Sequence, residues 1–404
     1  MSPTQVIVVG ARGRGVATEL VTAGITDVVV LDRSPVVCSR FDDDTHTWEL
    51  RTAAGERLHG SAVIAVQQPM LAAWTPELAG RNDFHGVSFH AAQWDADFDP
   101  IGKHVAVVGT DSAAGYHLPP LTAAAASVTV FAHPPRRIVA ELPLPPTRVK
   151  RWLRRQARAA LGRRPSRPAL VTSPIAAITA SGIRTSDGVD HRADAIIYGT
   201  GSTIADAAPE LIGTGGVSVK QAWVDGTEPF LGVAMHGFPN YFSITGPDVD
   251  AQTRYVVACL KAMKRSGSTR IEVLRSSQQV FNERAHLQAA PAFRVASAFD
   301  LSAGAPGGDQ VYDGIATLTI AGTSHRVRVR LAGHLHPIDG RYHWQGTLFG
   351  CPDQPLPDDA LKQTRTATLT VGDHSATARI VEQTPWGTHA VAGVGAPPYA
   401  MAQS

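Results

Sequence analysis

The sequence predicts an α/β chain with two Rossmann-like domains and a small C-terminal antiparallel β domain, expected to be a barrel. Two segments each show the order strand, glycine turn, helix, strand. The first runs from Val6–Val9 to Val28–Leu31, and the second from His104–Val108 to Val128–Phe131. Short β-branched runs of this kind fit strands buried on both faces of a parallel sheet. From residue 315 onward, apolar residues recur at alternate positions, the period of a strand with one buried face.

The segments between and after these units carry hairpin and helix patterns. A hairpin is expected at Thr47–Leu58, leading to a strand at Ala62–Val66, and a similar pattern recurs at Gly182–Gly201. Helices are expected over about 251–289. From 291 to 308 the composition shifts to Ala, Ser, Gly and Pro, which indicates a linker.

The C-terminal segment predicts short strands at Ile315–Ile320, Thr366–Val371 and Ala376–Val381. Gly and Pro turns between them favour a small antiparallel sheet or barrel of about 90 residues. The clearest alternation places an apolar set on one face and a charged set on the other: Val327, Val329 and Leu331 against Arg326, Arg328 and Arg330.

Composition narrows the class of protein. The 404 residues carry a formal net charge of +2, which gives no argument for nucleic-acid binding. Cys38, Cys259 and Cys351 stand far apart, in neither metal-like nor disulfide-like spacing, so a cytoplasmic location is expected. We expect no signal peptide and no integral membrane segment, because no apolar run approaches the roughly 18 residues of a span. Composition leaves the oligomeric state open.

The first glycine turn, Gly10–Gly15, follows the spacing of a dinucleotide-binding fingerprint. That fingerprint uses a first glycine for the tight turn, a second for close approach to a pyrophosphate, and a third for helix–strand packing. Gly10 and Gly15 take the first and third places, whereas Arg12 takes the second. Asp32, after the next strand, is placed to accept a hydrogen bond from a ribose hydroxyl. The turn is either a nucleotide site or a remnant that has lost its nucleotide.

The second turn, Gly109–Ala114, departs further from the fingerprint. Asp111 replaces the middle glycine, and Ala114 stands in the third place, where the motif tolerates it. A carboxylate aimed at a pyrophosphate is repulsive, so the sequence favours loss of nicotinamide-nucleotide binding. If a nucleotide binds, Gly109 and Ser112 are its expected contacts.

A longer motif lies between the two units and is carried by Phe84, Gly86, His90, Trp94 and Asp95. Its pattern, Phe-x-Gly-x3-His-x3-Trp-Asp, resembles the fingerprint of the Baeyer–Villiger-type flavin monooxygenases. Further similar phrases follow in order, and the resemblance covers about residues 4–290: Gly102–Thr110, Gly182–Gly188, Asp194–Gly201, Gly237–Phe242 and Gly246–Pro247.

The resemblance implies FAD on the Gly10 turn, NADP(H) on the Gly109 turn, and no metal. It also implies an FAD-binding-type domain at 1–98 and 195–290 and an NAD(P)-binding-type domain at 99–194, to which the composition and strand pattern add a linker at 291–308 and a β-rich domain at 309–400.

The sequence departs from the family where the family's chemistry takes place. The segment that lines the flavin ring is shortened, because the hairpin at Thr47 follows Asp32 almost at once. His133 stands where the family has the arginine that reads the 2′-phosphate of the reduced cofactor. No counterpart of the catalytic arginine stands out. A peroxyflavin needs a protected ring, a cationic stabiliser and a hydride donor, and all three are weakened here.

The C-terminal segment from Tyr312 to Pro398 resembles an uncharacterised actinobacterial domain found behind monooxygenase-like proteins. Its histidines at 334, 336 and 343 invite a metal hypothesis. No Cys, Asp or Glu is placed to complete such a site, so no metal is expected.

These observations predict a flavin-monooxygenase-like enzyme for a small hydrophobic organic substrate, in bacterial specialised metabolism. The departures favour a redox-neutral step such as cyclisation, isomerisation or elimination. An active FAD/NADPH-dependent Baeyer–Villiger or heteroatom monooxygenase is the alternative, and a non-catalytic accessory or ligand-binding protein is a further one. Catalytic residues are not identified; on position alone, the acid–base candidates are His85, His90, Asp111 and His133.

Overall fold

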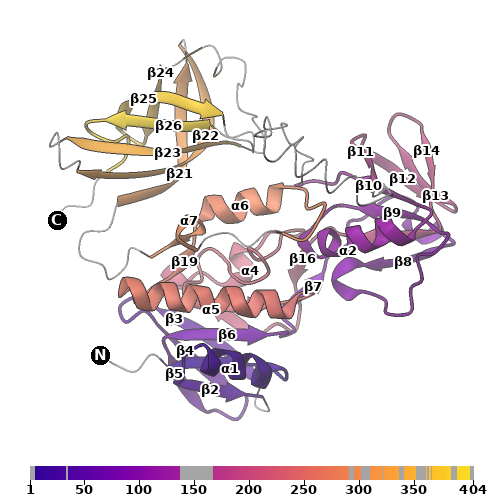
Figure 1. Ribbon diagram of the computed structural model, residues 1–404, viewed down its shortest axis with the longest axis horizontal. Coiled ribbons are helices and arrows are strands. Elements are labelled where there is room, and N and C mark those ends of the chain that lie inside the picture. Colours follow the sequence, from indigo (N-terminus) through magenta and orange to yellow (C-terminus); the bar gives the residue numbers. More distant parts are fainter. Residues whose placement is uncertain are drawn as a thin grey trace, which may run out of the picture. The chain divides into compact units, whose positions relative to one another are not determined.

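The computed structural model divides the chain into two compact units, each with its own hydrophobic core (Figure 1). Unit 1 comprises residues 1–138, 163–273 and 277–304, and unit 2 comprises residues 139–162, 274–276 and 305–404. Within these bounds the structure describes residues 5–32, 35–136, 167–290, 295–301, 310–320, 322–335, 341–351, 361, 364, 366–383 and 389–400.

The first sheet of unit 1 is parallel, with the strand order β18-β6-β1-β2. All residues of β1 and β6 are buried, as expected for β-branched strands covered on both faces. Helix α1 connects β1 to β2, which confirms the predicted strand–turn–helix–strand unit. The bounds are β1 Val6–Val9, α1 Gly13–Thr22, β2 Val28–Leu31, β6 Ala62–Val66, β18 Tyr241–Ile244 and α5 Val249–Ser266, a helix in the same core.

A mixed sheet follows the first βαβ unit, in the order β17-β3-β4-β5. The expected hairpin is present as β4 (Thr47–Thr52) and β5 (Arg57–Gly60). Strand β3 (Val36–Asp42) was not expected; it pairs antiparallel with β4 and parallel with β17 (Glu210–Ile212). The side chain of Trp48 on β4 is fully buried, and its indole N–H donates to the Pro239 carbonyl at 2.8 Å.

The second parallel sheet of unit 1 has five strands in the order β11-β10-β9-β15-β8. Helix α2 connects β9 to β10, as the second strand–turn–helix–strand pattern predicts. Three antiparallel strands, β12-β13-β14, form a separate small sheet. The bounds are β8 Val87–His90, β9 His104–Val108, α2 Ser112–Ala124, β10 Ser127–Phe131, β11 Ala169–Val171, β12 Ile175–Thr179, β13 Gly182–Thr185, β14 Asp190–Arg192 and β15 Ala195–Tyr198.

Strands β8 and β15 join this second sheet by pairing, since β15 lies between β8 and β9. The sequence boundaries at 98 and 195 assigned both strands to the first domain. A βαβ pattern identifies only the strands that flank its helix, so β8 and β15 had no local signal for their place in this sheet.

Short elements complete unit 1 and the region near residue 275. Residues 295–300, within the segment predicted as a linker, form α7 and a strand that pairs with β19. The bounds are β7 Leu71–Ala73, η1 Arg81–Asp83, η2 Ala91–Gln93, β16 Ser202–Ile204, η3 Thr214–Gly216, α4 Val219–Ala222, β19 Glu272–Val273, α6 Arg275–Glu283, α7 Val295–Ala298 and β20 Phe299–Asp300.

Unit 2 is a closed antiparallel barrel in the order β21-β22-β23-β26-β25-β24, which confirms the predicted C-terminal barrel (Figure 1). The predicted apolar face is buried, but Arg328 from the predicted charged face is buried too, and its Nε donates to the Gly350 carbonyl at 3.1 Å. The bounds are β21 Gln310–Ile320, β22 Thr323–Leu335, β23 Tyr342–Gly350, β24 Thr366–Val371, β25 His374–Gln383 and β26 His389–Val394.

Gly10 is the tightest point between β1 and β6. Its φ is +119°, and a Cβ on it would lie 2.2 Å from the Val66 carbonyl oxygen. Gly13, in the first turn of α1, packs on β1, where a Cβ would lie 2.9 Å from a Val8 methyl. Gly15 has nothing within 4 Å of its would-be Cβ. The helix–strand packing that the fingerprint assigns to its third glycine is therefore at Gly13.

Alanine substitutions at Gly10 and Gly15 should have opposite effects on stability. Gly10→Ala places a side chain on a backbone carbonyl at positive φ, so we expect a loss of more than about 2 kcal/mol in the free energy of unfolding. Gly15→Ala lies on an exposed helical position and should gain about 0.5–1 kcal/mol. Chemical denaturation measures both. Equal effects of the two substitutions would contradict this description of the turn.

Candidate functional site

The two glycine turns lie at equivalent places in the two parallel sheets. In each sheet the chain leaves a middle strand, β1 or β9, passes through a helix to one neighbour, and later returns on the other side of the middle strand. Open α/β sheets bind ligands at this reversal, outside the carboxyl ends of the strands. Gly109 repeats the role of Gly10, because its φ is +76° and a Cβ on it would lie 2.5 Å from the Gly199 carbonyl oxygen.

No side chain of the first turn caps the start of helix α1. Arg12 stands at the N-cap position of α1, is exposed, and makes no capping hydrogen bond. Asp32, the predicted ribose ligand, is paired with Arg14, whose Nε and Nη2 lie 2.8 and 2.7 Å from Asp32 Oδ2. The start of α1 thus carries two arginines and an uncapped helix end, an arrangement that favours an anion.

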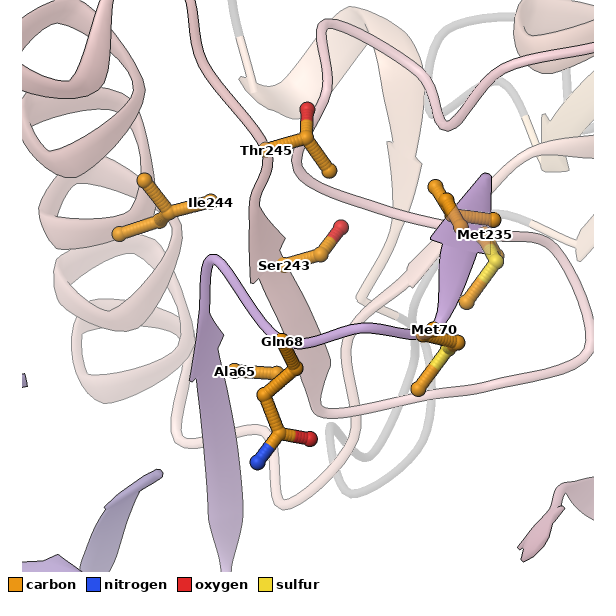
Figure 2. A pocket seen from close by; sticks show the side chains of 8 residues that line it. Ala65, Gln68, Met70, Met235, Ser243, Ile244 and Thr245 are labelled. Carbon is orange, nitrogen blue, oxygen red and sulfur yellow. The ribbon is translucent and has the colours of Figure 1, made fainter. Parts of the chain in front are cut away.

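A hollow lies beside the carboxyl ends of β6 and β18 (Figure 2). It includes about 290 Å³ of empty space, part of it open to solvent. Apolar and thioether groups dominate its wall, with a few hydroxyl and amide groups. Its lining residues are Ala65, Gln68, Met70, Leu71, Met235, Ser243, Ile244 and Thr245.

The second turn is capped from within the chain. Asp111 is 2% exposed, and its carboxylate accepts the Ala114 N–H at 2.8 Å on one oxygen and the Gly201 N–H at 2.9 Å on the other. The Asp111 side chain therefore serves as the N-cap of α2 and ties this helix to the end of β15.

A second carboxylate, that of Glu228, also binds the first turn of α2. Its two oxygens accept the Ser112 N–H at 3.0 and 3.2 Å, and one also accepts the Ser112 hydroxyl. Nη2 of Arg136 lies 2.9 Å from Glu228 Oε1, and the two side chains are only 2% and 10% exposed. A buried anion is thus held at the helix N-terminus by a hydroxyl, a backbone N–H and a guanidinium.

Asn282 of α6 holds this pair in place. Its Oδ1 accepts the Glu228 N–H at 2.7 Å, and its Nδ2 donates to the Glu228 carbonyl at 2.9 Å. The Asn282 carbonyl accepts a hydrogen bond from Nη1 of Arg136 at 2.9 Å. The Glu228 carboxylate is therefore positioned through its own backbone as well as through its oxygens.

Burial controls the electrostatics of the cluster. It raises the pKa of Glu228 to about 7, with Asp111 acting in the same direction and Arg136 against it. Burial and then Arg136 lower the pKa of His286 to about 4, so this imidazole is neutral at physiological pH. His286 lies close by, with Nε2 4.0 Å from Glu228 Oε1.

Of the predicted acid–base residues, His90 and Asp111 come together, with His90 Nε2 3.8 Å from Asp111 Oδ2. His90 Nδ1 accepts the Ala92 N–H at 3.1 Å, and burial lowers the pKa of His90. His85 is exposed. His133 lies beside Trp74, its Nδ1 2.7 Å from the Pro134 carbonyl, and burial lowers its pKa.

Residues 309–401 match the family model described as "Domain of unknown function (DUF4873)", which confirms the resemblance of the C-terminal segment to an uncharacterised domain. "Uncharacterized protein Rv0943c" of Mycobacterium tuberculosis (strain ATCC 25618 / H37Rv) is 60% identical over 317 residues, spanning 77% of this chain and 89% of that protein. The chain belongs to the family of that mycobacterial protein.

Distant homologues of this family are Baeyer–Villiger monooxygenases, as the motif at 84–95 predicts. A Baeyer–Villiger monooxygenase of Pseudomonas aeruginosa (strain PAO1) is 26% identical over 327 residues, spanning 60% of this chain and 62% of that protein. One from Streptomyces coelicolor is 22% identical, spanning 60% and 63%. The crystal structure of cyclohexanone monooxygenase from Rhodococcus sp. Phi1 bound to NADP+ is 18% identical, with a TM-score of 0.36 over 69% of this chain and 88% of that one.

In this monooxygenase-like family member, sequence reasoning missed Glu228, Arg136 and Asn282. Glu228 lies 116 residues from Ser112 and 54 from Asn282, so no local spacing relates them. The one available signal was Asp111, which stands in the second glycine place of the fingerprint.

The described parts of the chain contain neither a metal-binding cluster nor a membrane-spanning helix. Among these residues no group of three or more His, Cys, Asp or Glu side chains is arranged to hold a metal ion. Likewise, no helix formed by them has the length and apolarity needed to cross a membrane.

The raised pKa of Glu228 should make stability depend on pH. The folded-state pKa of about 7 lies above the ordinary 4.5, so this contribution to stability is complete below pH 4.5 and is lost as pH rises through 7. Relative to Glu228→Gln, the wild-type unfolding free energy should fall by roughly 2 to 3 kcal/mol between about pH 5 and pH 8. Chemical denaturation at both pH values measures this difference, with Glu56→Gln as the exposed control. A difference between wild type and Glu228→Gln that does not change with pH would contradict the raised pKa.

Proposed function

We propose that this chain is a monooxygenase-scaffold enzyme that converts a small hydrophobic organic metabolite without taking hydride from NADPH. The reaction is a redox-neutral step such as cyclisation, isomerisation or elimination. The observation that carries the proposal is the Glu228 carboxylate on Ser112, at the point of α2 where a dinucleotide pyrophosphate would lie.

NADP(H) does not fit the residues of the Gly109 turn. The Ser112 N–H and hydroxyl already bind an anion, and Asp111 adds a second buried carboxylate to the same helix end. A pyrophosphate would meet two carboxylates and one guanidinium, Arg136, that is already paired. Like charges at a buried site are strongly unfavourable, so binding requires displacement of Glu228.

FAD fits the Gly10 turn better. The turn keeps its positive-φ glycine, the helix end carries no side-chain cap, and Arg12 is exposed beside it. Gly10, the backbone of Arg12 and Asp32 would hold the cofactor, and a bound flavin would supply a redox-active ring. The side chain of Arg12 and the Arg14–Asp32 pair both have to rearrange for the family's mode of binding.

For a redox-neutral reaction, His90 is the best placed of the predicted acid–base residues. Burial lowers its pKa, and its Nε2 has no hydrogen-bond partner among the described residues. Because Nδ1 accepts the Ala92 N–H, the neutral ring carries its proton on Nε2, 3.8 Å from Asp111 Oδ2, where it would act as an acid.

The second candidate function is FAD/NADPH-dependent Baeyer–Villiger or heteroatom oxygenation. The open Gly10 turn and the distant homologues favour it. A non-catalytic accessory or ligand-binding role is the third candidate, favoured by the hollow at β6 and β18. We also propose that the protein is cytoplasmic and that it binds no nucleic acid.

The spectrum of the purified protein and an NADPH titration separate these candidates. We expect no saturable NADPH binding to the wild type, because Glu228 fills the helix end, and no bleaching of any bound flavin in stopped flow. Flavin at full occupancy that NADPH reduces rapidly would overturn the redox-neutral proposal. A colourless protein that takes up no added FAD would exclude the oxygenase.

Arg12→Gly should increase FAD retention. The substitution removes the side chain from the second glycine place of the fingerprint, where the backbone must approach a pyrophosphate. The ratio of flavin to protein absorbance after gel filtration in added FAD measures the effect. Arg57→Gly, an exposed arginine on β5, is the control for charge, and equal flavin retention in the two variants would contradict the prediction.

A further inference from the structure

The groups around the Glu228 carboxylate form a complete set of anion ligands. The Ser112 backbone N–H and hydroxyl come from the first turn of α2, and the Arg136 guanidinium comes from the segment after β10. Backbone N–H groups at a helix end together with an arginine are the donors that bind phosphate in proteins.

Arg136 is an anion ligand separate from the helix end. Its side chain is 2% exposed and Nη2 forms an ion pair with Glu228, whereas among the described residues neither Nη2 nor Nε has a partner in hydrogen-bond geometry. A buried guanidinium is costly unless an anion compensates it. Here the compensating anion belongs to the chain itself.

We propose that the Gly109 turn is an intact anion site that the chain fills with its own Glu228 carboxylate, so that removing this side chain opens the site to inorganic phosphate groups. The inference rests on the closed turn of the proposed function but not on its redox-neutral chemistry.

The position of Asp111 is compatible with this site. Both of its oxygens are engaged by backbone N–H groups, at Ala114 and Gly201. The charge of Asp111 weakens the binding of an incoming anion. Its oxygens do not occupy the hydrogen-bond donors of Ser112. His286 is neutral and His90 has a lowered pKa, so Arg136 is the cation of the cluster at neutral pH among the residues described.

The test compares pyrophosphate binding by the full-length wild type, Glu228→Ala and Glu56→Ala. Glu56→Ala removes one exposed negative charge and so controls for net charge. Calorimetric titration and thermal unfolding are run with sodium pyrophosphate at constant ionic strength. Glu228→Ala should bind pyrophosphate about tenfold or more tightly than the other two proteins, because one or two charge-assisted hydrogen bonds become available.

Ser112→Ala in the Glu228→Ala background locates the binding. Loss of the hydroxyl should weaken pyrophosphate binding, whereas binding elsewhere on the surface would not change. If Glu228→Ala does not fold in plain buffer, its refolding yield is compared in pyrophosphate and in potassium chloride of equal ionic strength. A higher yield in pyrophosphate supports the site, and equal yields overturn it.

The outcomes separate this inference from the proposed function. If neither wild type nor a folded Glu228→Ala binds pyrophosphate, the filled-site inference fails and the closed turn stands. If wild type itself binds pyrophosphate as tightly as Glu228→Ala, with Ser112→Ala weakening both, Glu228 does not close the turn and both proposals fail.

Discussion

The compensation of one buried charge organises the centre of unit 1. The side chains of Glu228 and Arg136 are both buried, and either charge without the other would destabilise the fold. Satisfying the pair brings together α2, the segment after β10 and α6, through Ser112 and Asn282. A neutral helix end would have needed only the Asp111 cap. The charged pair adds geometric constraints among segments that are far apart in the sequence, at the point where a dinucleotide domain would ordinarily meet its ligand.

The fold could be predicted wherever the physical signal is local. Continuous β-branched runs such as Val6–Val9 predict strands with two covered faces, and period-two alternation predicts the barrel. The sequence did not reveal β3, because its residues 36–42 mix apolar, polar and charged types without a sustained apolar run. It also did not assign β8 and β15 to their sheet, since partner choice among parallel strands depends on crossover connections rather than on the strands themselves.

The candidate site was predictable in part for the same reason. Gly10 and Asp111 lie in turns whose residue spacing follows a dinucleotide-binding fingerprint, so the sequence predicted their positions. The packing glycine proved to be Gly13, because helix phase decides which residue faces the strand. Glu228 had no such signal. A single carboxylate in a loop fits many roles, and only the folded chain brings it to α2.

The closed barrel of unit 2 has a consequence for how this family could recruit other molecules. Each of its six strands, β21 to β26, has a hydrogen-bonded neighbour on both sides, so the described barrel has no edge strand, although β21 pairs with β24 only over Thr317–Thr319. A peptide therefore has no full-length edge strand to which it could add, and two copies have none along which to join. We expect recognition by this domain to use mainly side chains on its outer faces or the loops at its ends. A sequence can vary there without changing the hydrogen-bonded frame.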